Sequence, residues 1–124
     1  MTLWTFVLVS LAGGGGSAGR FVTDALIRSR VRTHFPVATV LINLVGSFAL
    51  GLVAGAAAGS HGTALTVVGT GLLGGFTTFS TSAVETTRLA LSGRLGWSAL
   101  NALGTLLGCM ALVCAGLALT QDWL

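Results

Sequence analysis

The sequence predicts an all-α membrane protein with four transmembrane helices, of which the third is interrupted within the membrane. Of its 124 residues, 53% are hydrophobic and only 7% are charged, whereas an ordinary soluble domain carries about 25% charged residues. One helical crossing of the bilayer needs about 20 residues, so this length accommodates four crossings and little else. We therefore expect a single domain, residues 1–124, in the cell membrane.

Four apolar segments define the expected helices. They cover approximately residues 3–22, 37–58, 64–87 and 95–119. The second segment follows Pro36, and proline is favoured at the start of a helix. Short turns are expected at residues 59–62 and 92–94, where glycine stands beside serine. Glycines spaced by four, such as Gly51 and Gly55, allow two membrane helices to approach closely.

The third segment contains a run that does not suit a helix in hydrocarbon. Residues 74–82 read Gly-Gly-Phe-Thr-Thr-Phe-Ser-Thr-Ser, and glycine and threonine are poor helix formers. Backbone groups freed inside a bilayer are tolerated only where protein or a polar cavity surrounds them, and such breaks usually mark an ion or substrate site. Freed carbonyls suit a hard cation, while hydroxyl donors and a phenylalanine ring edge suit an anion. The chemistry of these residues alone is therefore compatible with a site for a cation or for an anion.

The distribution of charge predicts the orientation of the helices. All six basic side chains are arginines, and they lie in or beside residues 22–36 and 88–94. Four crossings place these two connections on the same side of the membrane. The positive-inside rule assigns that side to the cytoplasm and leaves both termini outside the cytoplasm. The sequence pI of about 10.3 is therefore interpreted as a topology signal, with no nucleic-acid partner.

Few polar side chains lie at membrane depth. Asn43 shares a helix face with Thr39 and either lines a pore or forms an interhelical hydrogen bond. Arg20 and Glu85 stand at the cytoplasmic ends of the first and third helices. The arginine can extend to lipid headgroups, and the glutamate can pair with Arg88. The sequence contains no nucleophile–base pair and no metal-ligand cluster, so we do not expect an enzyme.

Three blocks of the sequence resemble the small fluoride channels called FluC or CrcB. Residues 13–21 are similar to the family's GGxxGxxxR-aromatic opening, residues 35–48 to FPxGTxxxNxxGSF, and residues 71–85 to GxxGGxTTFSTF followed by a glutamate. These blocks span nearly the whole chain. The resemblance implies an antiparallel dimer of four-helix subunits that exports fluoride passively and so lowers its cytoplasmic concentration. It also implies a structural Na⁺ at the dimer centre.

The resemblance further implies roles for individual residues. It assigns carbonyl ligands of Na⁺ to Gly74 and Thr77. It assigns fluoride-pore contacts to Asn43, Phe79, Ser80 and Thr81. Arg20 matches the family's membrane-end arginine, and Glu85 matches the glutamate after the third block; their roles are structural or electrostatic. The central cation would offset the cost of an anion in a medium of low dielectric constant.

Two positions depart from the family pattern. The second phenylalanine of TTFSTF is Ser82 here, and the family's tyrosine on the fourth helix has no counterpart because the chain contains no tyrosine. Half of the aromatic pair of each pore is therefore missing from this subunit. Together with the one-sided arginines, this predicts a chain that inserts in one orientation and pairs with an oppositely oriented relative.

Two other functions stay open from the sequence. A small multidrug-type transporter has a similar size and four spans, but it relies on a carboxylate deep in the first helix, and the first carboxylate here is Asp24. A non-conducting subunit that only completes a heteromeric fluoride channel is the other alternative, and Ser82 favours it.

Overall fold

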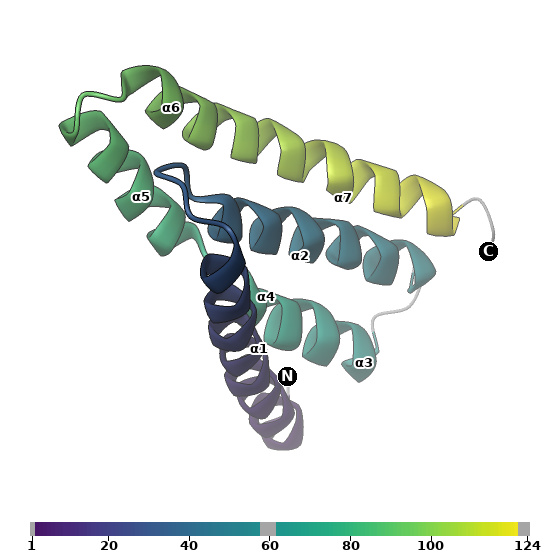
Figure 1. The fold of residues 1–124 in the computed structure, drawn as a ribbon. Coiled ribbons are helices and arrows are strands. Elements are labelled where there is room, and N and C mark those ends of the chain that lie inside the picture. The colour runs from purple at the N-terminus through teal and green to yellow at the C-terminus, as the bar shows by residue number, and fades with distance from the viewer. Residues whose placement is uncertain (1, 58–61, 122–124) are drawn as a thin grey trace.

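The computed structural model describes residues 2–57 and 62–121, and the secondary structure within them is entirely helical (Figure 1). The first two expected segments form α1 (Leu3–Arg30) and α2 (Val37–Ala56). The third segment forms α3 (Thr63–Leu65), the π-helical η1 (Thr66–Leu73), α4 (Gly74–Phe76) and α5 (Phe79–Leu91). The fourth forms α6 (Leu95–Ala99), the π-helical η2 (Leu100–Gly104) and α7 (Thr105–Gln121). The all-α prediction is confirmed.

Three of the four expected spans have the length and composition to cross a membrane. They are Val37–Ala56, Thr63–Leu91 and Leu95–Gln121, with mean hydropathies of 2.2, 1.2 and 2.2. The first expected span, on α1, is not among them because its glycine run and Arg20 lower its apolar content. The structure supports a multi-pass membrane protein, while the count of four spans stays a prediction.

The first helix extends well beyond the apolar segment that predicted it, from Leu3 to Arg30. Its 28 residues span about 42 Å at ~1.5 Å each, whereas the hydrocarbon core is about 30 Å thick. The extension is held by an ion pair at i and i+4 between Asp24 and Arg28, 2.8 Å long. Arginines in the last turn also favour the negative end of the helix dipole.

The expected interruption of the third segment is present at Thr77 and Thr78. Both residues have extended backbones, with φ −80° and ψ 160° for Thr77 and φ −149° and ψ 117° for Thr78. Thr78 caps α5, because its Oγ1 accepts a hydrogen bond of 3.2 Å from the backbone N–H of Thr81. The break therefore ends α4 and starts α5 within one span.

Of the two connections that the sequence predicted to be turns, the structure describes one completely and the other only at its last residue. Residues 92–94 join α5 to α6 as expected, and Gly93 has a φ of +83°, which favours glycine. The other expected turn, at residues 59–62, lies outside the described residues except for Gly62, which precedes α3.

Glycine allows the helices to pack with their backbones nearly in contact. In Figure 1, α7 runs alongside α2, and α1 crosses η1 and α4. A methyl group added to Gly51 would overlap the Val113 carbonyl of α7, and one added to Gly75 would overlap the backbone of Gly13. These contacts confirm the close packing that the glycine spacing predicts.

We expect Gly16→Ala to destabilise the fold and Gly14→Ala, on the same helix, to leave it nearly unchanged. A methyl group at Gly16 would overlap the carbonyl of Leu72 and approach the backbone nitrogen of Phe76, whereas nothing lies within 4 Å at Gly14. Overpacking of this kind costs about 1–3 kcal/mol. Thermal unfolding in detergent micelles measures the difference, and equal melting temperatures for the two variants would contradict this packing.

Candidate functional site: the broken helix and its two cavities

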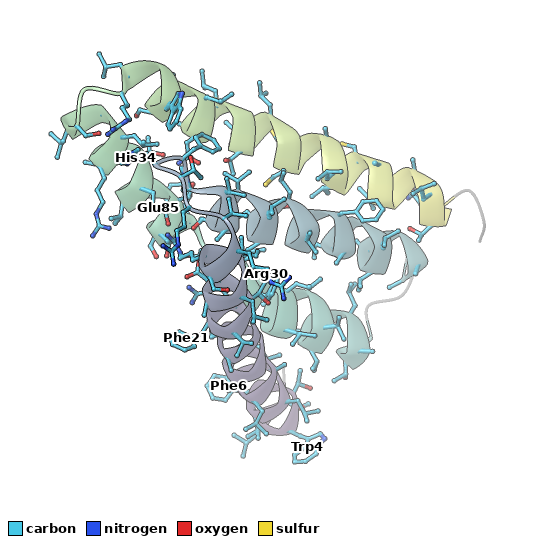
Figure 2. The ribbon with its side chains drawn as sticks, viewed as in Figure 1. Trp4, Phe6, Phe21, Arg30, His34 and Glu85 are labelled. Carbon is cyan, nitrogen blue, oxygen red and sulfur yellow. The ribbon has the colours of Figure 1, made fainter. Side chains whose placement is uncertain are left out.

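Several of the side chains buried in the described part of the chain are polar. Thr39, Asn43, Ser98 and Asn101 are each at most 7% exposed. Several large aromatic side chains, by contrast, are exposed. In Figure 2, Trp4, Phe6 and Phe21 project away from α1, with exposed fractions of 68%, 59% and 76%. Polar groups buried at membrane depth are costly unless they are hydrogen-bonded, so their partners define the site.

Asn43 on α2 holds the break in the third span. Its Nδ2 donates to the Thr78 carbonyl at 3.0 Å, and the Thr78 N–H donates to its Oδ1 at 2.8 Å. The pair bonds both backbone groups of Thr78, whose N–H lies in the gap between α4 and α5 and whose carbonyl stands at the N-cap of α5. Of the two roles that the sequence left open, the interhelical hydrogen bond is present. Because a carboxamide has two N–H donors, one of them is left for a further acceptor.

The hydrogen bonds of the break leave two carbonyl groups without their usual helical donors. In an α-helix the carbonyl of residue i accepts from the N–H of residue i+4. For Gly74 that donor is the N–H of Thr78, which bonds Asn43 instead. For Thr77 it is the N–H of Thr81, which bonds the Thr78 hydroxyl. The two carbonyl oxygens assigned to a cation by the family resemblance are therefore released from the helix.

Arg20, which the sequence placed at the end of the first helix, lies inside α1 and against the break, because α1 continues to Arg30. Its Nε donates to the Gly75 carbonyl at 3.4 Å, and the Ser17 hydroxyl donates to the same oxygen at 3.3 Å. Sequence reasoning did not identify Ser17, although it stands three residues before Arg20 on the same helix face. The first helix thus satisfies a third carbonyl of the interrupted segment.

The hydroxyl groups after the break lie close to one another. The Thr78 hydroxyl is 3.1 Å from that of Thr81 and 3.4 Å from that of Ser80. Phe79, at the start of α5, is 88% exposed. Donor groups and a free aromatic edge therefore occupy adjacent positions on the first turn of α5.

Glu85 pairs with Arg28 of α1 rather than with Arg88, the partner suggested by sequence spacing. Its Oε1 is 3.0 Å from Arg28 Nη2 and accepts a hydrogen bond of 2.7 Å from the Thr39 hydroxyl. The local expectation did not account for α1, which extends past the apolar segment and places its last turns beside α5. Figure 2 shows Glu85 near the C-terminal end of α1.

Arg28 is held from a second direction by Asp24. Its Nε bonds both carboxylate oxygens of Asp24, at 2.8 and 2.9 Å. On this extension of α1, beyond the apolar segment, these hydrogen bonds raise the pKa of Arg28 further above its usual value, so the guanidinium stays charged. The i, i+4 spacing of the two residues is the sequence signal that could have revealed this pair.

Two cavities meet the interrupted span. The larger, of about 610 Å³, is lined by Ser80, Thr81 and Glu85 and by three arginines, Arg28, Arg88 and Arg94. These arginines come from both connections that the sequence assigned to the cytoplasm. Because they line one cavity, the two connections lie at the same end of the helices. The smaller cavity, of about 330 Å³, is lined by Gly74, Thr77, Asn43 and Phe79, with Ser82 nearby. All four family pore positions and both assigned carbonyl residues therefore face a cavity.

Among the described residues, no group of three or more His, Cys, Asp or Glu side chains is placed to hold a metal ion. The oxygen atoms that meet at the break belong chiefly to backbone carbonyls and hydroxyls. Such ligands suit hard cations and disfavour transition metals.

A polar, interrupted membrane helix of this kind is typical of membrane proteins that transport ions or small substrates, and comparison with known proteins points to the same class. Residues 7–117 match the family described as CrcB-like protein, Camphor Resistance (CrcB). The chain is 42% identical over 122 residues to fluoride-specific ion channel FluC 1 of Leifsonia xyli subsp. xyli, covering 96% of this chain and 87% of the relative. It is 41% identical over 118 residues to fluoride-specific ion channel FluC 2 of Cutibacterium acnes, covering 93% and 96%.

An archaeal relative gives the same result. The chain is 45% identical over 108 residues to fluoride-specific ion channel FluC 2 of Haloarcula marismortui, covering 87% of each protein. The chain therefore belongs to the CrcB family. This membership confirms that it is not an enzyme, because the named relatives are ion channels, and it excludes the multidrug-type transporter as the family of this chain.

Proposed function

We propose that this chain is a subunit of a fluoride-specific ion channel that exports fluoride passively from the cytoplasm. The observation that carries the proposal is the break at Thr77 and Thr78, clamped by Asn43 between the two cavities. An anion that leaves water for the membrane needs donors to replace its hydration shell. The remaining N–H of Asn43, the ring edge of Phe79 and the hydroxyls of Ser80 and Thr81 are donors of that kind.

A structural Na⁺ at the centre of an antiparallel dimer is the second part of the proposal. The carbonyl oxygens of Gly74 and Thr77 have lost their helical donors, and carbonyl oxygen is a preferred ligand of hard cations. These residues fit the ion, and a second subunit would bring further oxygens. A fixed positive charge would lower the cost of placing an anion nearby in a medium of low dielectric constant.

A dimer with an oppositely oriented relative is the third part. Phe79 is 88% exposed, and a second subunit packed on this face would cover it. All arginines lie in or beside the connections at one end, which favours one orientation, with both termini outside the cytoplasm. A conducting dimer of two such chains would require half of them to insert against this bias.

A non-conducting role within such a dimer is the second candidate function, and Ser82 favours it. Ser82 lines the smaller cavity beside Asn43 and Phe79, where the family pattern has a second phenylalanine. A subunit that lacks this ring contributes an incomplete set of aromatic edges. In that case the chain completes the dimer while its partner supplies the conducting surface.

Fluoride efflux from liposomes tests the channel. The chain is co-purified with a relative of opposite arginine bias and reconstituted into liposomes loaded with fluoride or, in a parallel sample, with chloride. We expect fluoride efflux well above the rate of protein-free liposomes and retention of chloride, measured with ion-selective electrodes. Equal release of the two anions would contradict fluoride selectivity, and no release of either would contradict a channel.

Removal of Na⁺ is expected to destabilise the dimer. A ligand that binds only the folded state at 100 times its dissociation constant stabilises that state by about 2.7 kcal/mol. Exchange of Na⁺ for N-methylglucamine should therefore lower the melting temperature of the purified dimer, and returning Na⁺ should restore it. A melting temperature that is equally restored by any monovalent chloride salt would contradict a specific cation site.

A further inference from the structure

Glu85 places a carboxylate on the wall of the larger cavity, beside the hydroxyls that the proposed channel uses. Thr81 and Glu85 are four residues apart on α5 and so lie on the same helix face. Both line the cavity of about 610 Å³, together with Ser80. An anion in this cavity, between these hydroxyls and the three arginines that also line it, therefore meets the carboxylate of Glu85.

An isolated carboxylate at this place would repel the anion. The Glu85 side chain is only 12% exposed, and charges act more strongly on one another as water is excluded. Its Oε2 is buried and accepts no hydrogen bond from the described part of the chain. The charge of Glu85 is therefore poorly screened by solvent and needs compensation from the protein.

Arg28 supplies the compensating charge, and its position is fixed on both sides. Arg28 Nη2 lies 3.0 Å from Glu85 Oε1, while its Nε is bonded by Asp24. The Thr39 hydroxyl holds the same Oε1 of Glu85 at 2.7 Å. Because a guanidinium offers several donors in a rigid plane, one arginine can bridge both carboxylates.

We propose that Arg28 is a positioning and charge-balancing residue for anion conduction. It holds the Glu85 carboxylate near Thr39 and, with its positive charge shared between Asp24 and Glu85, offsets part of the negative charge near the hydroxyls of Ser80 and Thr81. This inference rests on the proposed fluoride channel, and it assigns a function to the extension of α1. Arg28 is the only arginine that forms an ion pair with Glu85 among the described residues.

The test compares Arg28 variants in the reconstituted complex with its partner subunit. Arg28→Gln is expected to slow fluoride efflux about tenfold, because it leaves Glu85 uncompensated. Arg28→Lys keeps the charge and should restore most of the rate. The double variant Arg28→Gln/Glu85→Gln removes both charges and should conduct faster than Arg28→Gln alone. Arg30→Gln, on the same helix end but outside the cavity lining, is the control and should match the wild type.

Each outcome decides for or against the proposal. A purely structural role would make the double variant as slow as Arg28→Gln or slower, and that result would overturn charge balancing. So would equal rates for Arg28→Gln and Arg30→Gln. If Arg28→Gln does not assemble, the lysine and double variants still carry the comparison with the wild type. Failure of the wild-type complex to conduct fluoride would instead refute the proposed function itself.

Discussion

Asn43→Asp is expected to lower fluoride efflux by about 100-fold. Aspartate keeps the acceptor for the Thr78 N–H but loses the donor that bonds the Thr78 carbonyl at 3.0 Å. A carboxylate oxygen would then face that carbonyl oxygen. Asn43 is 7% exposed, so the new charge would be poorly hydrated, and it would repel the anion in the smaller cavity.

Asn43→Leu separates the two causes of this loss. Leucine has a similar volume and removes both hydrogen bonds to Thr78, but it adds no charge. We expect it to slow efflux less than aspartate does, since it loosens the break without repelling the anion. Efflux is compared at equal amounts of assembled dimer, determined by size-exclusion chromatography. If Asn43→Asp conducts fluoride at the wild-type rate, Asn43 does not lie on the ion pathway.

The break itself was predictable because its causes are local. Adjacent glycines and hydroxyl side chains weaken a helix wherever they stand, so residues 74–78 predict an interruption without any knowledge of the fold. Close packing at Gly51 and Gly55 was predictable in the same way, because small side chains at this spacing let helices approach; that α7 is the partner of α2 came only from the structure. Both features depend only on residues that are close together in the sequence.

The partners of the polar side chains were not predictable, because they depend on how distant helices cross. Arg28 and Glu85 are 57 positions apart, and they meet only because α1 continues to Arg30 and inclines across the chain toward α5. The sequence offered Arg88 as a partner because only neighbours on one helix can be derived from spacing. Asn43 illustrates the same limit. Whether it lines a pore or forms an interhelical hydrogen bond depends on which part of another helix faces it, and the sequence does not give that.

The π-helical turns in η1 and η2 also escaped the sequence. A π-turn widens the helix by one residue and is often found near functional sites. Gly69 and Gly71 are buried in η1, where Gly71 meets Val9 and Ala12 of α1. Asn101 is buried in η2 and donates to Thr86 at 2.7 Å. Both π-helical segments therefore contact other helices. The residue pattern along one helix does not predict such contacts.

Expressed without a partner, the chain is expected to give no fluoride protection to fluoride-sensitive cells. The six arginines flank connections at one end, so nearly all copies should insert in the same orientation. Antiparallel dimers of this chain would then be rare. Co-expression with a relative of opposite arginine bias should restore growth in fluoride. Dimers purified from membranes of the two kinds of cell should show the same difference in liposome efflux.

Three variants separate the effect of orientation from the effect of the missing aromatic ring. Substituting serine for Arg30, Arg32 and Arg94 reduces the bias, so both orientations become accessible and copies of the chain can pair. Adding Ser82→Phe to that variant restores the second ring of the family pattern. We expect efflux from the chain alone only when both changes are combined, because a paired chain without the ring still lines an incomplete pore. Ser82→Phe alone should stay inactive, since its copies still insert one way. Rapid fluoride efflux from the unmodified chain alone would show that neither the arginine bias nor Ser82 prevents it from pairing with itself.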